Sequence, residues 1–319
     1  MSTEEIYQNI IEEAESLEQE LIKLRREFHQ YPEPGWMEMR TSARIAELLE
    51  SYGCDQVLMG TEVCKADARM GVPEERLLEQ HYKEVKALGQ VSEEKLKKTR
   101  GGFTGVIGIL HGKLSEERTA SEKASERASE NQVLAFRFDI DALPVTECEN
   151  MDHFPEKQGF RSKCPGYMHA CGHNIQVSVM YGVAAAMTRC GVLDQLGGNI
   201  EFMAVPAEEY IELDYRSRLK KEGKIQYFSG KAEAIRKGAF DDVDMAVMAH
   251  NYPISEQGYK CSPASAWNGF IGKQVRFIGK QAHAGGAPWD GINALNMANL
   301  AMTGMHFQRE TFHDDDKVR

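Results

Sequence analysis

The sequence predicts an α/β layered fold, followed by the first βα part of a second, smaller domain. Three observations support it. Apolar stretches typical of buried strands alternate with stretches of helical periodicity. Polar residues directly follow several of those strands, where sheets of this class bind ligands. The pattern restarts near the end of the chain, so we expect domains at residues 1–263 and 264–319.

The N-terminal third is predicted to be mainly helical. Apolar residues recur three, four or seven apart between Ile6 and Phe28, which predicts a long amphipathic helix that ends before Pro32. A second helix is predicted from about Glu38 to Ser51. Residues 75–100 have helical periodicity but are very polar, so we expect them on the surface rather than in the core.

The middle of the chain alternates strand and helix patterns. Strands are predicted at Val133–Phe138, Asn199–Val205 and Asp244–Ala249, with a helix running to about Cys190, and the second domain is predicted to contain a strand at Lys273–Ile278 and a helix at about Ile292–Gln308. Residues 113–132 are low in complexity and poor in large apolar groups. Such a segment cannot bury enough surface to order itself, so we expect a flexible loop there.

Composition narrows the class of protein. The chain has 319 residues, of which 42% are hydrophobic and 27% charged, as in ordinary globular proteins. Its net charge of −11 argues against nucleic-acid and anionic-membrane partners. The N-terminus is acidic rather than basic and apolar, and the seven cysteines are scattered. These features predict a cytoplasmic protein with reduced thiols.

Three residues of metal-ligand type lie at predicted turns and strand ends. Cys171 and His173 are two apart on a turn before a helix, and thiolate and imidazole both bind zinc and its neighbours. Taken alone, this pair is a weak signal, because cysteine is often simply buried. His250 ends an apolar strand. A lone histidine there is usually structural.

Carboxylates gather at the same predicted positions. Glu208 and Glu209 directly follow a buried strand, so one could bind a metal while the other acts as a general base on water. A solvated acidic turn is the competing interpretation. Asp139 and Asp141 could orient imidazole ligands, or could simply terminate their strand. His283 lies in a Gly/Ala-rich loop, which permits close approach of a substrate or is merely an exposed loop.

The order of these motifs is more specific than any one of them. DID, HACGH, PAEE, a strand ending in histidine, and AHAGGAP follow one another along the chain. In this order the sequence resembles the two-metal aminoacylase, hippurate hydrolase and indole-acetyl-amino-acid hydrolase family of metallopeptidases. Two segments, GTEVCKADARMGVPEE and GGFTGV, resemble an insertion typical of the p-aminobenzoyl-glutamate hydrolase branch of this family.

The resemblance implies a three-layer, zinc-peptidase-like α/β catalytic domain with a mixed sheet, followed by a partial α+β lid or dimerisation domain. It implies a metal-dependent hydrolase of N-acyl amino acids, aminobenzoyl-glutamate-like compounds or dipeptides, with two divalent ions (zinc or manganese) and a homodimer or a heterodimer with a related subunit. The implied metal ligands are Cys171, His173, Glu209 and His250, the implied general base is Glu208, and His283 is implied to reach the substrate carboxylate or the developing oxyanion.

The sequence departs from the family pattern in three ways. Asn174 and Gln176 stand where the family usually has aspartate and histidine, which predicts weaker electrostatic support for the cations. The segment from Tyr210 is longer and highly charged, so it is expected to reshape the substrate site. The family also has another histidine ligand beyond the position where residue 319 ends this chain, so we expect a C-terminally truncated chain.

Two alternatives therefore remain. One is a non-catalytic subunit or an inactive remnant of such an enzyme. The other is a structural zinc site that contains Cys171 and His173.

Overall fold

The computed structural model describes residues 1–69, 71–114, 132–209, 213–227, 235–236, 238–252, 261–263, 275–313 and 315. Its contacts divide the chain into two compact units, Met1–Pro253 and Ile254–Arg319, and each is described here by itself. The domain boundary expected at residue 263 stays a prediction. Most of the loop expected at 113–132 lies outside the described residues.

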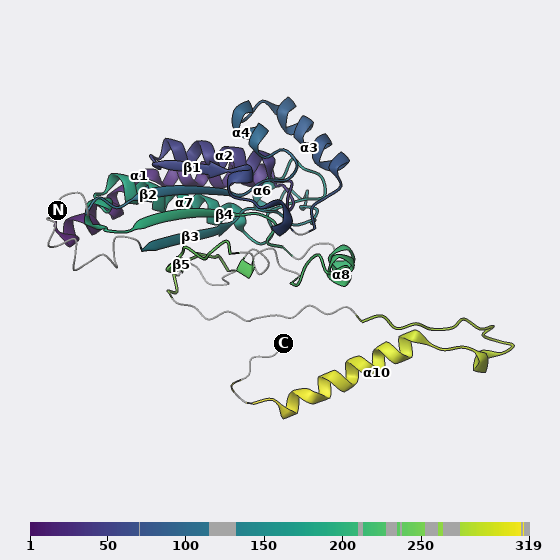
Figure 1. Cartoon of the computed structure of the whole chain (residues 1–319). Coiled ribbons are helices and arrows are strands. Elements are labelled where there is room, and N and C mark those ends of the chain that lie inside the picture. The colour runs from purple at the N-terminus through teal and green to yellow at the C-terminus, as the bar shows by residue number, and fades with distance from the viewer. Residues whose placement is uncertain are drawn as a thin grey trace. The chain divides into compact units, whose positions relative to one another are not determined.

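The first unit is built on a mixed five-stranded sheet, as the sequence predicts (Figure 1). The strand order is β1-β2-β4-β3-β5. β2 pairs antiparallel with β1 and β4, whereas β3 pairs parallel with β4 and β5. The strands are β1 (Gln56–Met59), β2 (Val106–His111), β3 (Val133–Asp139), β4 (Asn199–Val205) and β5 (Met245–Val247).

The parallel pairing places three chemically important segments at one edge of the sheet. Asp139 at the end of β3 pairs in register with Val205 at the end of β4. β5 runs parallel to β3 on its other side. The segments that follow β3, β4 and β5, which carry DID, PAEE and His250, therefore leave the sheet in the same direction.

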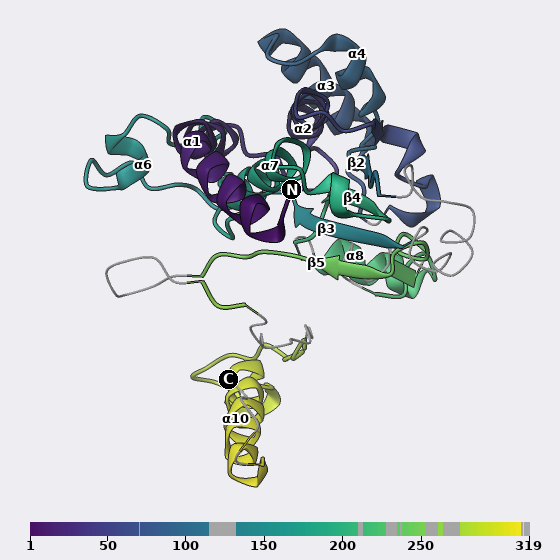
Figure 2. The same ribbon diagram turned by 90° about the vertical axis from the view of Figure 1, so that its left-hand side faces the viewer.

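Helices α1 (Thr3–Gln30), α2 (Met39–Ser51) and α7 (His173–Arg189) lie together on one side of this sheet (Figure 2). A capping box between Ser2 and Glu5 begins α1. Between these helices and the sheet lies a core that includes Phe28, Tyr181 and Phe202, each with no exposed side-chain surface. This packing fixes the start of α7, where the HACGH motif lies.

The polar helices of residues 75–100 contribute to a small hydrophobic core of their own. This corrects the expectation that the segment lies on the surface and buries no residues. Leu78, Tyr82 and Val85 of α3 (Glu75–Leu88) are buried with Leu96 of α4 (Glu93–Lys98) and Met39 of α2. Their spacing of three, four and seven residues places the α3 members on one face. The overall polarity of the segment masks this narrow stripe.

The second unit contains α10 (Ala294–Phe307), close to the predicted helix. The strand predicted at Lys273–Ile278 is wrong in its described part, because residues 275–278 are not in a strand. A β-strand requires a hydrogen-bonded neighbour. The described part of this unit offers an isolated bridge between Lys280 and Ile292 instead.

The remaining described elements are short. They are the helices α6 (Phe154–Lys157) and α8 (Leu213–Lys221) and the 3-10 turns η1 (Gly60–Glu62), η2 (Ala66–Ala68), η3 (Leu193–Gln195), η4 (Pro288–Asp290) and η5 (Gln308–Thr311). Among the described helices, none combines the length and the apolar character that crossing a membrane requires.

Candidate metal centre

The turn before α7 brings Cys171 and His173 to the strand ends. Gly172 between them has a backbone φ of 105°, and a Cβ atom on it would lie 2.0 Å from Oδ1 of Asn251. Only glycine fits this position without displacement. The turn therefore holds Cys171 and His173 against the segment that follows β5, and His173 begins α7 with 1% of its surface exposed.

The imidazole of His173 has a defined orientation. Its Nδ1 lies 2.8 Å from the backbone oxygen of Asp141 and 3.2 Å from the Oδ1 atom of the same residue. An Nδ1–H that donates to Asp141 leaves the lone pair of Nε2 available as a ligand. Nε2 lies 3.6 Å from Oε2 of Glu208 and 3.9 Å from Oε1 of Glu209.

His250 is arranged in the same way. Its Nδ1 lies 2.6 Å from the backbone oxygen of Asn251, and its Nε2 lies 3.4 Å from Sγ of Cys171. The rings of His173 and His250 are perpendicular, with centroids 6.3 Å apart. Both imidazoles therefore direct Nε2 toward the same small volume, and the thiol of Cys171 shares it.

Two groups of potential ligands result. Cys171, His173 and His250 form one, and Asp139, His173 and Glu208 form the other, with ligand atoms in each group within 4.8 Å of one another. Nε2 of His173 and Oε1 of Glu209 are buried without a hydrogen-bond partner among the described residues. Thiolate, imidazole and carboxylate are the donors that zinc and manganese accept. These residues therefore fit divalent cations.

The electrostatics of the cluster also favour a cation. Burial, followed by the charge of Asp141, raises the pKa of Glu209 to about 7. Burial lowers the pKa of His173, but contacts with Asp141 and Cys171 and the charge of Asp139 raise it to about 11. Positive charge at Nε2 is thus strongly stabilised, and a divalent ion there would displace the proton.

The two aspartates of the DID motif occupy different environments. Asp141 contacts Nδ1 of His173, as a residue that orients an imidazole ligand would. Asp139 forms an ion pair with Arg137, and its Oδ2 lies 4.0 Å from Nε2 of His173. Gln176 also supports this strand end, because its Oε1 accepts a hydrogen bond from the backbone N–H of Asp139 at 3.0 Å.

Asn174 and the charged segment after PAEE both make contacts near the cluster. The Nδ2 atom of Asn174 lies 3.3 Å from Nδ1 of His29 and 3.4 Å from the backbone oxygen of Arg25. Arg216, on α8, donates through Nη2 to the backbone oxygen of Glu209 at 2.9 Å. The long charged segment thus supports the PAEE turn through at least one buried residue.

His283 belongs to the second unit. Its Nδ1 accepts a hydrogen bond from the backbone N–H of Gly286 at 2.8 Å, and its side chain is exposed. Its approach to a substrate stays a prediction.

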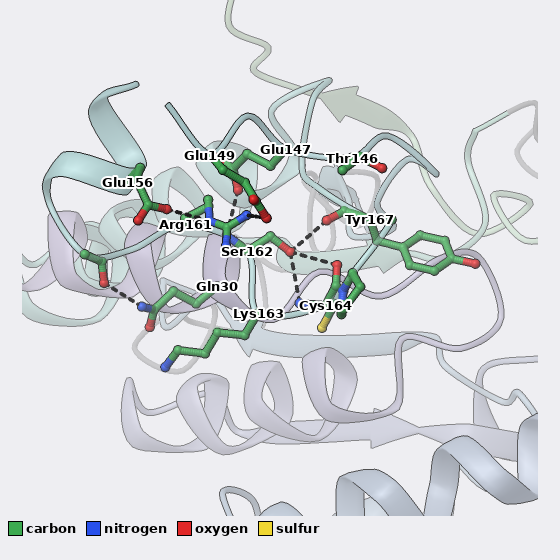
Figure 3. Close-up of a pocket in the computed structure, with 13 residues that line it drawn as sticks. Gln30, Thr146, Glu147, Glu149, Glu156, Arg161, Ser162, Lys163, Cys164 and Tyr167 are labelled. Carbon is green, nitrogen blue, oxygen red and sulfur yellow. Dashed lines mark hydrogen bonds and ion pairs between the residues drawn. The ribbon is translucent and has the colours of Figure 1, made fainter. Parts of the chain in front are cut away.

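A separate cavity of about 460 Å³ lies beside the loop that leads to α7 (Figure 3). Its lining includes Glu147, whose Oε2 accepts a hydrogen bond from the backbone N–H of Ser162 at 2.6 Å, and Arg161, which pairs with Glu149 and Glu156. The predicted site residues do not line this cavity, so we do not assign the chemistry to it.

The sequence did not point to Glu38, Asn251 or Arg216, which contact the cluster or the PAEE turn. Asn251 follows His250 directly and acts through its backbone, which no side-chain pattern reveals. Glu38 stands at the start of the second predicted helix, and its complete burial is visible only in the structure.

Comparison with known proteins agrees with this arrangement. Residues 135–266, which include the cluster, match the model of Peptidase family M20/M25/M40. The chain is 30% identical over 287 residues to a homolog of one subunit of p-aminobenzoyl-glutamate hydrolase from Haemophilus influenzae, with 90% of this chain and 59% of the relative covered. It is 31% identical to an indole-3-acetyl-aspartic acid hydrolase of Enterobacter agglomerans, with 90% of this chain and 58% of the relative covered.

A solved structure is also similar. The aminobenzoyl-glutamate utilization protein of Klebsiella pneumoniae is 26% identical, with a TM-score of 0.51 over 76% of this chain and 45% of that chain. The chain spans a little under three-fifths of the length of the curated relatives it matches. The ordered motifs, the mixed sheet and these matches together make the chain similar to members of peptidase family M20/M25/M40, and residues 135–266 carry the match to the family model.

Proposed function

We propose that this chain carries the metal-binding part of an amidohydrolase that cleaves the amide bond of N-acyl amino acids, aminobenzoyl-glutamate-like compounds or dipeptides. One observation carries the proposal. Two imidazoles, His173 and His250, have Nδ1 against backbone oxygens and direct Nε2 toward Cys171 and the carboxylates of the PAEE turn. The names of the similar proteins supply the substrate class.

The proposed ligands are Cys171, His173, Glu209 and His250, with two divalent ions of zinc or manganese. Asp139 also belongs to a potential ligand group in the structure, so it is a further candidate for binding the second ion. Bound divalent ions lower the pKa of water and polarise a carbonyl group. The remaining steps belong to residues of this chain.

Glu208 is the proposed general base. Its Oε2 lies 3.6 Å from Nε2 of His173, so its carboxylate borders the volume in which ligands converge. From there Glu208 accepts a proton from the attacking water and passes it to the leaving amine nitrogen. Asp141 holds the tautomer of His173 throughout. His283 is proposed to stabilise the developing oxyanion or bind the substrate carboxylate.

Partners and compartment complete the proposal. A homodimer or a heterodimer with a related subunit is proposed, because the names of two similar proteins describe one subunit of a hydrolase and its homolog. The cytoplasm is the proposed compartment, because all seven cysteines are free thiols in the structure and reducing compartments preserve such thiols.

Replacing Glu208 by glutamine tests the proposal. E208Q keeps the shape of the side chain and removes the base, so we expect unchanged metal content and a kcat lower by about 10²–10⁴-fold on an N-acyl amino acid panel that includes p-aminobenzoyl-glutamate. Glu201→Gln, a change on the strand that precedes the PAEE turn, is the matched control and should retain turnover.

The outcome also separates the alternatives. A metal-loaded wild-type chain without turnover on the panel, whether alone or mixed with a related subunit, contradicts the enzymatic proposal and favours a non-catalytic role. Metal that stabilises the fold without any turnover in the same experiment favours a structural zinc site. Unchanged turnover in E208Q removes Glu208 from the role of base.

A further inference from the structure

Glu38 is a carboxyl residue buried completely between the start of α2 and the PAEE turn. Its Oε1 accepts a hydrogen bond from the backbone N–H of Ala207 at 2.8 Å. Its Oε2 lies 2.7 Å from the hydroxyl oxygen of Thr104, which is also buried. Burying a carboxyl group is costly unless its hydrogen bonds are satisfied, and both oxygens of Glu38 have partners.

The partner of Glu38 has an unusual backbone. Ala207 has a φ of 52° and is 1% exposed, although it is not glycine. Such a conformation persists only when surrounding contacts impose it. Gly35 packs closely against Ala207, because a Cβ atom on Gly35 would lie 2.9 Å from both Cα and Cβ of Ala207. Ala207 is therefore held between Gly35 and the carboxyl group of Glu38.

Ala207 directly precedes the proposed base and ligand. The backbone of Glu209 is also held, because its N–H donates to Oδ2 of Asp141 at 3.0 Å and its carbonyl accepts from Arg216 at 2.9 Å. Glu38 thus anchors the beginning of the turn, and Asp141 and Arg216 anchor its end. Between these anchors the carboxylates of Glu208 and Glu209 face Nε2 of His173.

Helix capping does not account for Glu38. It occupies the N-cap position of α2, but its side chain makes no capping hydrogen bond. Glu33 performs that function, accepting from the backbone N–H groups of Arg40 and Thr41 at 3.0 and 2.7 Å. The side chain of Glu38 instead makes hydrogen bonds with Ala207 and Thr104.

We propose that Glu38 is a positioning residue of the metal centre: through the Ala207 N–H it fixes the turn that presents Glu208 and Glu209. This rests on the proposed function, because the turn matters only if those carboxylates bind metal and move a proton. The N-terminal segment that joins α1 to α2 thereby becomes part of the site, although it contributes no ligand.

Two substitutions separate positioning from bulk stability. Burial, followed by the charge of Asp141, raises the pKa of Glu38 well above its usual value, so glutamine resembles the protonated side chain. In E38Q the carbonyl oxygen can accept from Ala207 and the amide can donate to the Thr104 hydroxyl. In E38A both contacts are lost. Leu17→Ala, which shortens a buried residue of the α1 core, is the control for general destabilisation.

Two measurements are made on each full-length variant below its unfolding temperature. One is a Co²⁺ titration, followed by the absorption that a cysteine thiolate produces on binding Co²⁺. The other is hydrogen exchange of the backbone amides from Val205 to Glu209. We expect E38A to bind Co²⁺ at least about tenfold more weakly, as when support of a metal ligand is removed, and to exchange faster at Ala207. E38Q and L17A should resemble wild type in both.

The proposal is overturned if E38A matches L17A in both measurements, or if E38Q is as impaired as E38A. A wild-type chain that takes up no Co²⁺ contradicts the proposed function, and amide exchange at Ala207 then decides the role of Glu38 alone. Should E38A not fold, Gly35→Ala displaces Ala207 from the opposite side and must give the same faster exchange. Wild-type exchange in folded G35A also overturns the proposal.

Discussion

Gly172 and Gly166 both have positive backbone φ angles, 105° and 84°, and both belong to the segment around the start of α7. They differ in their surroundings. A Cβ on Gly172 would collide with the side chain of Asn251, whereas a Cβ on Gly166 would meet nothing within 4 Å. Alanine substitutions at these two positions therefore separate the effect of backbone strain from the effect of displacing the proposed metal ligands.

Gly166→Ala is expected to cost about 1–2 kcal/mol of unfolding free energy, from the strain of a left-handed alanine alone, with unchanged metal affinity. Gly172→Ala should cost more, because Asn251 must move, and should also weaken metal binding by displacing Cys171 and His173. Chemical denaturation and metal titration of both variants check this. Equal metal affinity in the two would contradict the role assigned to Gly172.

The residues proposed as ligands could be named from the sequence, but the orientation of their side chains could not. Cys171, His173 and His250 are recognisable by residue type and by their positions at strand ends and turns. The atoms that fix the imidazole tautomers are backbone oxygens of Asp141 and Asn251, and backbone atoms leave no mark on a side-chain pattern. The hydrogen-bond partners of Glu38, Ala207 and Thr104, are distant from it in sequence, so the sequence pattern does not reveal these contacts either.

At the scale of elements, α3 is attached to the segment before α2 through His81. The Nε2 atom of His81 lies 2.7 Å from Oε1 of Glu33, which is buried. Burial lowers the pKa of His81, but the hydrogen bond and charge of Glu33 outweigh it and raise the pKa above its usual value. A histidine with a raised pKa stabilises the folded state below its unfolded pKa and loses this contribution as the pH rises through the folded value.

The attachment of α3 and α4 should therefore weaken as the pH rises above about 6.5, the unfolded pKa of histidine, and through the raised pKa of His81 in the folded state. Hydrogen exchange of residues 75–98, corrected for the intrinsic pH dependence of exchange, measures this. His81→Gln keeps a hydrogen-bond donor but cannot titrate, so its corrected protection should not change over the same range. Identical pH profiles for wild type and H81Q would argue against the ion pair.

Elements with strong periodicity were predictable, and those that depend on distant partners were not. The sequence predicted β4 at its observed bounds and α1 and α10 to within a few residues. β1 escaped notice because it has four residues and acquires its structure by pairing with β2. In the strand expected at 273–278, the described residues 275–278 are not in a strand, since an apolar stretch does not become a strand without a hydrogen-bonded neighbour.

For the whole molecule, the fold class could be predicted from the sequence. The order of the strands could not, because it depends on pairings between distant residues. Alternating strands and helices predicted the α/β fold, and the resemblance to the metallopeptidase family implied the mixed sheet. The order β1-β2-β4-β3-β5 depends on pairings between residues far apart in the sequence, such as Ala135 with Glu201. This order brings the ends of β3, β4 and β5 together and so creates the cluster.

This chain is proposed to hold divalent metal through residues of its first unit. Elemental analysis of the purified folded chain, loaded with zinc or manganese and dialysed exhaustively, tests it most directly. We expect about two ions per chain in the wild type, and markedly fewer in His173→Ala, because His173 belongs to both ligand groups. A folded wild-type chain that retains no metal would contradict it.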